Sequence, residues 1–255
     1  MPLEIVTVPC LSDNYAFLIH NADTGETALV DAPEAAPLIA ALTERGWTLH
    51  EILITHHHDD HIAGVPELRE KYGAKIIGAK ADAHRLPPLD EAVSEGDKVS
   101  VCSSDATVLD VSGHTVGHIA YHIPSAAAVF TADSLMALGC GRVFEGTMAQ
   151  MWNSLSKLAA LPPETVVYSG HEYTAANAAF ALTVEPENPA LQKRAADVAE
   201  ARSKGLPTVP SQLSEELYTN PFLRASTPEV KTALGVENAT DAEVFAEIRG
   251  RKDRF

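Results

Sequence analysis

The segment Thr55–His61, with the sequence THHHDDH, combines four histidines and two aspartates in seven residues. It follows directly on the apolar segment 51–54, which is typical of a short β-strand. Imidazole nitrogens and carboxylate oxygens are zinc ligands, so the composition indicates a metal site, although a solvated loop could also hold these residues. In an extended segment, side chains i and i+2 point the same way. We therefore expect His56 and His58 to face one site and His57 to face away.

Asp60 and His61 lie where the chain is expected to turn into a helix. An aspartate at that position can also be a plain N-cap, because it accepts backbone hydrogen bonds and faces the positive end of the helix dipole. Thr55 is expected to fix the exit of the strand by hydrogen bonding. His57 and Asp59 are assigned to the surroundings of the site or to solvent.

Three further candidates stand at the ends of predicted strands, and each alone would more often be an ordinary polar residue: His114 in SGHTVGH, Asp133 in FTAD and His171 in YSGHEY. A catalytic zinc normally takes three protein ligands and keeps one position open for water. Seven donors instead favour two cations about 3.5–4 Å apart, which can clamp an oxyanion between them. The candidate ligands are His56, His58, Asp60, His61, His114, Asp133 and His171.

The elements that must position these residues form a strand-rich first part and a helical second part. Two helices are predicted in the first part, over residues 34–46 and 61–73. The predicted strands cover residues 4–8, 15–20, 27–32, 51–55, 75–79, 98–101, 107–111, 118–123, 127–132 and 165–170.

From about Thr174 the sequence is Ala-rich and predicts helices over 175–184 and 189–205, then two short helices near the end. Residues 206–222 between them are either a long ordered connection or a disordered linker, and Leu213, Leu217 and Phe222 favour order. The pattern predicts an α/β catalytic domain over residues 1–173 and a helical domain over residues 174–255.

Bulk composition excludes several classes of protein. A net charge of −16 argues against nucleic-acid binding. No apolar run is long enough to span a membrane, and the N-terminus lacks the pattern of a signal peptide. Three widely spaced cysteines, Cys10, Cys102 and Cys140, suit free thiols in a reducing, cytoplasmic compartment. The basic terminal sequence RGRKDRF is either a solvated tail or an anion clamp.

The motif THHHDDH resembles the THxHxDH signature of the metallo-β-lactamase fold superfamily, and the three later candidates follow in that superfamily's order. The segments CGRVFEGT, GHEYT, VPSQLSEELYTNPFLR and RGRKDRF resemble glyoxalase II, the hydroxyacylglutathione hydrolases, over essentially the whole chain. This resemblance implies an αββα sandwich with a C-terminal helical appendage. It also implies that His56, His58 and His114 bind one metal, that Asp60, His61 and His171 bind a second, and that Asp133 bridges them.

The resemblance implies a thioesterase that hydrolyses S-D-lactoylglutathione to D-lactate and glutathione, the second step of methylglyoxal detoxification. Two divalent cations are expected, zinc first, with iron or manganese as alternatives, in a monomeric protein. Asp60 and Asp133 are the expected catalytic residues, since Asp60 both ligates and orients the attacking hydroxide. The residues that correspond to the family's glutathione contacts are Arg142, Phe144, Tyr173, Arg249 and Lys252.

Two of these contacts depart from the family pattern. The family often has tyrosine at the position of Phe144, so one hydroxyl contact to glutathione is missing here. It often has lysine at the position of Arg142, so the charge is kept but its geometry differs. Affinity for glutathione is therefore expected to differ.

Four alternatives remain at this point. A persulfide dioxygenase of the same superfamily uses one iron and lacks the long helical appendage. A metallo-nuclease conflicts with the acidic charge, and a β-lactamase would normally be exported. A non-catalytic metal-binding module conflicts with the full set of seven candidate ligands.

Overall fold

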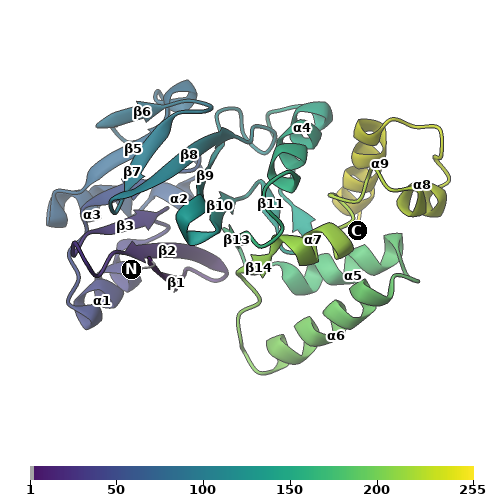
Figure 1. Ribbon diagram of the computed structural model, residues 1–255, viewed down its shortest axis with the longest axis horizontal. Helices are drawn as coiled ribbons and strands as arrows, with labels where there is room; N and C mark the ends of the chain where they lie inside the picture. The colour runs from purple at the N-terminus through teal and green to yellow at the C-terminus, as the bar shows by residue number, and fades with distance from the viewer. Residues whose placement is uncertain (1–2) are drawn as a thin grey trace. The chain divides into compact units, whose positions relative to one another are not determined.

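The computed structural model describes residues 3–255 and divides into two compact units (Figure 1). Unit 1 comprises the chain up to Asp110 together with Val116–Thr131, and unit 2 comprises Val111–Thr115 and Ala132–Phe255. The predicted boundary at residue 173 lies inside unit 2, so the division into a catalytic and a substrate-binding domain stays a prediction.

Unit 1 contains two β-sheets. In the first, the strand order is β1-β2-β3-β4-β5-β6, with β1 to β3 antiparallel and β3 to β6 parallel. In the second, β7 to β10 follow one another as antiparallel neighbours. The strands are β1 Glu4–Cys10, β2 Asn14–His20, β3 Thr27–Val30, β4 Glu51–Leu53, β5 Lys75–Ala79, β6 Glu91–Val93, β7 Lys98–Val101, β8 Ser104–Asp110, β9 Ile119–Ile123 and β10 Ala128–Ala132.

The two sheets of unit 1 pack face to face. The rings of Phe17 on β2 and Phe130 on β10 lie 5.7 Å apart. The hydroxyl of Tyr121 on β9 donates a hydrogen bond of 3.0 Å to the carbonyl of Ile54, which directly follows β4. Every residue of β2 and β10 is buried, as expected for strands covered on both faces. The ends of β4 and β10 carry the candidate ligand segments.

Two main helices cover the first sheet of unit 1: α1 (Ala35–Arg45) and α3 (Val65–Tyr72). Both present leucines to a core that includes Ile52 and Ile76 of the sheet. Helix α1 ends at Gly46, whose φ of 67° is the left-handed conformation that glycine adopts without steric cost. The single-turn helix α2 (Asp59–Ile62) and the 3₁₀ turns η1 (Lys80–Asp82) and η2 (Pro124–Ala126) complete the unit.

Unit 2 is mainly helical. Helices α5 and α6 lie side by side, and α4 packs on α9, where Trp152 and Phe245 are 6.2 Å apart (Figure 1). Its strands are β11 Leu135–Met136, β12 Gly139–Cys140, β13 Val166–Ser169 and β14 Ser211–Gln212. Its helices are α4 Met148–Ala159, α5 Thr174–Val184, α6 Pro189–Ser203, α7 Leu213–Thr219, α8 Pro228–Leu234 and α9 Asp241–Asp253.

A buried polar network ties α6 and α7 to the β11–β12 hairpin. The carboxylate of Glu216 is fully buried and accepts hydrogen bonds from Arg194, from the backbone N–H of Leu138 at 2.9 Å and from Asn220 at 3.0 Å. Asn220 also donates to the carbonyls of Met136 and Gly139. The helices therefore hold the hairpin through its backbone.

Most predicted elements are present, and the differences have local causes. Residues 206–222 are ordered, as their apolar side chains indicated, and contain β14 and α7. Helix α4 was not predicted, although Thr147 and Gln150 form a capping box at its start. Helix α9 has 13 residues and is not short. Within residues 3–255, no helix combines the length and the apolar character needed to cross a membrane.

Candidate metal centre and neighbouring substrate surface

In unit 1, His56 and His58 bring two ring nitrogens together. His56 Nε2 lies 3.1 Å from His58 Nδ1, whereas His56 Nδ1 lies 3.0 Å from the Thr55 hydroxyl. Donors that share one tetrahedral zinc at 2.0–2.1 Å lie about 3.3 Å from each other, so this spacing fits two ligands of one ion. His118 stacks on the His56 ring at 4.5 Å and helps to fix its plane.

Asp31 holds Thr55 and His61 of the unit 1 site in place. Asp31 was not identified as a candidate from the sequence. It follows β3 in the left-handed conformation, with a φ of 57°. Its carboxylate accepts hydrogen bonds from the Thr55 N–H at 2.9 Å and hydroxyl at 2.8 Å, which confirms the expected role of Thr55. It also lies 2.8 Å from His61 Nδ1, so Nε2 of that ring is left for a metal. The sequence signal that could have identified Asp31 is an aspartate near the end of a predicted strand.

Asp60 is not the N-cap of α2. The N-cap is His58, without a side-chain capping bond, and Asp60 stands in the first turn of the helix. Asn14 donates to the Asp60 carboxylate at 3.1 Å and to its carbonyl at 3.0 Å. This carboxylate also lies 3.9 Å from His61 Nε2. The side chain is therefore oriented towards His61, as expected for a ligand.

His57 points away from these rings, as the strand geometry predicted. Its Nδ1 lies 2.9 Å from the buried carboxylate of Asp82, which also accepts from Arg85 Nε at 2.5 Å. Arg85 donates in turn to the carbonyl of Val116 at 2.9 Å. Asp59 is exposed, as expected. His57 thus anchors residues 55–61, which carry the ligand candidates, to the chain around Asp82.

In unit 2, Asp133 offers one carboxylate oxygen to each of two histidines. Its Oδ2 lies 3.4 Å from His114 Nε2, and its Oδ1 lies 3.3 Å from His171 Nε2. All three side chains are nearly buried. Both distances match the spacing of about 3.3 Å between ligands of one tetrahedral ion. The arrangement fits a carboxylate that bridges two cations, with one histidine beside each.

Backbone groups fix these unit 2 ligands. His114 Nδ1 donates to the carbonyl of Arg142 at 2.8 Å, which leaves Nε2 as the metal-binding atom. Gly141 is required here, because a Cβ at that position would stand 1.9 Å from the carbonyl oxygen of Asp133. The Gly170 N–H donates to the carbonyl of Ala132 at 3.0 Å and so joins the segment before His171 to the residue before Asp133.

The predicted substrate residues of unit 2 adjoin its metal-ligand candidates. Phe144 is exposed and lies 5.3 Å from the His114 ring, and Tyr173 stacks on the His171 ring at 4.7 Å. Arg142 lies over the Phe144 ring at 5.9 Å with 57% of its side chain exposed. The structure therefore brings Arg142, Phe144 and Tyr173 to one surface beside Asp133 and its histidines.

Lys252 lies at the C-terminal end of α9 and contacts α5. Its ammonium donates to the Ala176 carbonyl at 3.1 Å and lies 5.2 Å from each of the Phe180 and Phe255 rings. Partial burial, followed by the neighbouring positive charge of Arg249, lowers the pKa of Lys252. The ammonium is therefore held against α5, the helix whose N-cap is Tyr173.

Arg249 differs from Lys252 because its guanidinium is buried, with 6% of the side chain exposed. It donates to the Cys140 carbonyl at 2.9 Å and to Asp253 Oδ1 at 3.1 Å, and it lies 5.2 Å from the Phe222 ring. Burial raises the pKa of the adjacent Cys140 thiol to about 11, even though the Arg249 charge opposes that shift. The structure thus places one of the predicted substrate residues inside unit 2.

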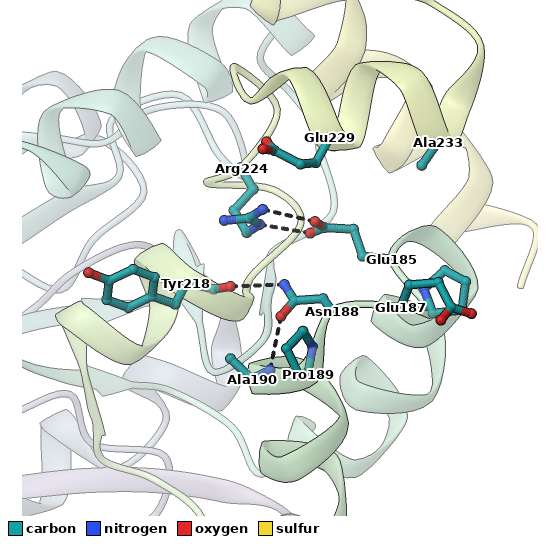
Figure 2. A pocket seen from close by; sticks show the side chains of 10 residues that line it. Glu185, Glu187, Asn188, Pro189, Ala190, Tyr218, Arg224, Glu229 and Ala233 are labelled. Atoms are coloured by element: carbon teal, nitrogen blue, oxygen red, sulfur yellow. Dashed lines mark hydrogen bonds and ion pairs between the residues drawn. The ribbon is translucent and has the colours of Figure 1, made fainter.

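Unit 2 also contains a separate pocket of about 470 Å³ between the α5–α6 corner, the end of α7 and helix α8 (Figure 2). At its centre, Arg224 pairs with both oxygens of Glu185, at 2.8 and 2.9 Å. Asn188 caps α6 and donates to the Tyr218 carbonyl (Figure 2). None of the predicted site residues lines this pocket. Its polar groups join the helices of unit 2.

Comparisons with known proteins match the whole chain. The model of the metallo-beta-lactamase superfamily matches residues 12–171, and the model described as the hydroxyacylglutathione hydrolase C-terminus matches residues 172–255. A hydroxyacylglutathione hydrolase of Ruegeria pomeroyi is 66% identical over the full length of both chains. One of Cereibacter sphaeroides is 65% identical and one of Rhodobacter capsulatus 54%, again over both full lengths.

Solved structures share the fold at lower identity. The B3 metallo-beta-lactamase BLEG-1 superposes with a TM-score of 0.68 at 20% identity, over 86% of this chain and 99% of that one. ETHE1 from Myxococcus xanthus gives 0.64 at 26% identity, over 99% and 98%. TTHA1623, solved in a di-iron-bound form, gives 0.63 at 24%, over 86% and 100%. The expected α/β metallo-β-lactamase fold with a C-terminal helical region is confirmed.

Proposed function

The chain belongs to the hydroxyacylglutathione hydrolase family, and from this membership we propose that it hydrolyses S-D-lactoylglutathione to D-lactate and glutathione. The observation that carries the chemistry is Asp133, whose two carboxylate oxygens each face one histidine at ligand spacing. The alternatives of a persulfide dioxygenase and a non-catalytic module are not favoured, because full-length relatives at 54–66% identity are all named as hydroxyacylglutathione hydrolases.

We propose that these candidate ligands hold two divalent cations. The donor spacing within each unit and the oriented ring nitrogens of His61 and His114 support this. Zinc is our first choice, with iron or manganese as alternatives, since nitrogen and carboxylate donors suit all three. The proposed sets are His56, His58 and His114 for one cation and Asp60, His61 and His171 for the other, with Asp133 as the bridge.

When bound, such cations supply water of lowered pKa, about 7 at one zinc, and neutralise negative charge on a reacting oxygen. The residues of the chain position that chemistry. Asp60, held by Asn14, would orient the attacking oxygen, and Asp133 presents one carboxylate oxygen to each of His114 and His171. The leaving thiolate needs little help from a general acid, because a thiol has a pKa of about 8.5.

We propose that the surface of Arg142, Phe144, Tyr173 and Lys252 binds the glutathione part of the substrate, with Arg249 behind it. Exposed cations beside aromatic rings suit an anionic tripeptide, and the chain is otherwise strongly acidic. Phe144 offers its ring face but no hydroxyl, and the planar guanidinium of Arg142 can bind a carboxylate through two N–H groups.

The metal proposal is tested by replacing Asp133 with alanine and measuring thioester hydrolysis together with metal content per chain. Both are expected to fall, because the variant loses the carboxylate that both histidines face. Asp59→Ala is the matched control, since that aspartate is exposed beside the ligands. Normal metal content and turnover in the Asp133 variant would rule out the bridging role. The metal found in the wild-type chain decides between zinc, iron and manganese.

The substrate surface is tested separately with Lys252→Ala. We expect KM for S-D-lactoylglutathione to rise while metal content stays normal, because the ammonium of Lys252 is held by the Ala176 carbonyl and the Phe180 ring and Lys252 is not a proposed metal ligand. Arg254→Ala removes an exposed charge from the same tail and should leave KM unchanged. An unchanged KM in the Lys252 variant would show that Lys252 does not help to bind the glutathione part of the substrate.

We also propose that the protein is a cytoplasmic monomer. The three cysteines are free and buried, and glutathione chemistry belongs to reducing compartments. Fractionation of the source cells and sedimentation of the purified chain test the two statements.

A further inference from the structure

A single carboxylate stands between two arginines of the proposed glutathione surface. Oδ1 of Asp253, the last residue of α9, lies 2.9 Å from Arg249 Nη2 and 3.4 Å from Arg142 Nε. The side chain of Asp253 is 31% exposed, between the buried Arg249 and the open Arg142. Lys252, next to it in the chain, has no carboxylate partner among residues 3–255 and is held by a carbonyl and two rings.

We propose that Asp253 is an internal counter-ion that weakens the hold of this surface on the carboxylates of glutathione, and so sets the affinity for both substrate and product. The inference rests on the proposed function, because it takes Arg142 and Arg249 as binding residues. It assigns to Asp253 a role in specificity that is distinct from metal binding.

The contacts of Asp253 show why it cannot be a passive surface charge. Its short contacts to the buried Arg249 keep the carboxylate in place, since a buried guanidinium without a counter-ion is costly. The longer contact, to the exposed Arg142, is the weaker of the two. A glutathione carboxylate that reaches Arg142 therefore meets a guanidinium that Asp253 already partly neutralises. The negative charge of Asp253 also stays close to that carboxylate.

This arrangement has a consequence for turnover. Glutathione as the product carries the same carboxylates as the substrate, so every contact that tightens substrate binding also retains product. Contacts that are equally strong in the bound substrate and in the transition state do not accelerate the chemical step. The Asp253 counter-ion at Arg142 therefore weakens the binding of the glutathione product. Lys252, which has no such counter-ion in the described part of the chain, still attracts the carboxylates of the substrate.

The test compares wild-type protein with Asp253→Asn, which keeps an oxygen to accept the Arg249 hydrogen bonds and removes only the charge. We expect KM for S-D-lactoylglutathione to fall about 2- to 5-fold, the range of one partly exposed ion pair. The dissociation constant of S-methylglutathione, measured by calorimetry, should fall by a similar factor. Both differences should shrink at high salt. For S-D-lactoyl-N-acetylcysteamine, a thioester without carboxylates, the ratio between the two proteins should stay near one.

An unchanged or raised dissociation constant for S-methylglutathione, in a variant with a wild-type melting transition, would overturn the inference. If Asp253→Asn does not fold, Arg142→Gln and Lys252→Gln replace it. Because Asp253 partly neutralises Arg142 but not Lys252, the loss of Arg142 should raise the dissociation constant clearly less than the loss of Lys252. Equal losses would overturn the inference. Calorimetry needs no turnover, so these results stay separate from the proposed function, which fails only if wild-type protein does not hydrolyse S-D-lactoylglutathione.

Discussion

The buried carboxylate of Glu216 offers a quantitative test of how unit 2 holds the hairpin between Asp133 and Arg142. One of its oxygens accepts from Arg194, and the other accepts from the Leu138 N–H and from Asn220. Glu216→Gln keeps the shape but has only one acceptor oxygen. Whichever way the amide turns, an NH₂ group faces a donor.

The expected cost follows from what is left unpaired. In either orientation the buried guanidinium of Arg194 loses the charge of its main counter-ion, at a cost of about 3–5 kcal/mol. If the amide nitrogen faces the hairpin, the Leu138 N–H also loses its acceptor, at about 1–3 kcal/mol, whereas Asn220 keeps the carbonyls of Met136 and Gly139. The amide is expected to adopt the cheaper orientation, so the expected cost is roughly 3–5 kcal/mol. For a chain of this size that corresponds to a fall in Tm of roughly 6–20 °C.

Glu215→Gln is the matched control. Glu215 Oε2 lies 3.3 Å from Nε of the same Arg194, but its side chain is 48% exposed. Such a pair contributes about 0–1 kcal/mol, so the melting transition should move little. Urea and thermal unfolding of both variants, followed by circular dichroism, give the comparison. A Glu216 variant within about 0.5 kcal/mol of wild type would refute the reasoning, since surface substitutions reach that size.

Three further outcomes are expected. Asp82→Asn removes the charge that anchors His57, so affinity for zinc, measured by competition with a chelator, should fall, but by less than the roughly 10- to 100-fold typical of losing a direct partner of a ligand, because His57 is not a ligand candidate. An unchanged affinity would show that residues 55–61 keep their conformation without the Asp82 charge. Because burial lowers the pKa of Lys252, that residue loses its charge at a pH below the usual range for lysine, so S-methylglutathione should bind progressively more weakly as the pH rises through it. Lys252→Arg, whose charge persists, should remove this part of the pH dependence, and parallel profiles would contradict it. Burial raises the pKa of all three thiols, to about 12 in two and about 11 in the third, so iodoacetamide at pH 7 should leave the folded protein unmodified at Cys10, Cys102 and Cys140.

The parts of this protein that sequence could predict depend on local regularities. Alternating and continuous apolar runs located most strands of both sheets, since side-chain direction in a strand repeats every two residues. The same periodicity separated His56 and His58 from His57, and the structure confirms that separation. Helix α4 was missed because its apolar face begins after a glycine-containing loop, although its capping box was visible in the sequence.

The tertiary structure alone decided which distant groups serve the site. Asp31 contacts His61 across 30 residues, Asp82 contacts His57 across 25, and Arg249 reaches the Cys140 carbonyl across 109. No periodicity records such pairs, because they form only when separate elements pack together. The same packing buries Arg249, leaves Arg142 exposed and places Asp253 between them. Sequence therefore determined which residues are ligand candidates and which strands carry them. Folding decided which charges are neutralised, since that depends on burial and on partners far along the chain.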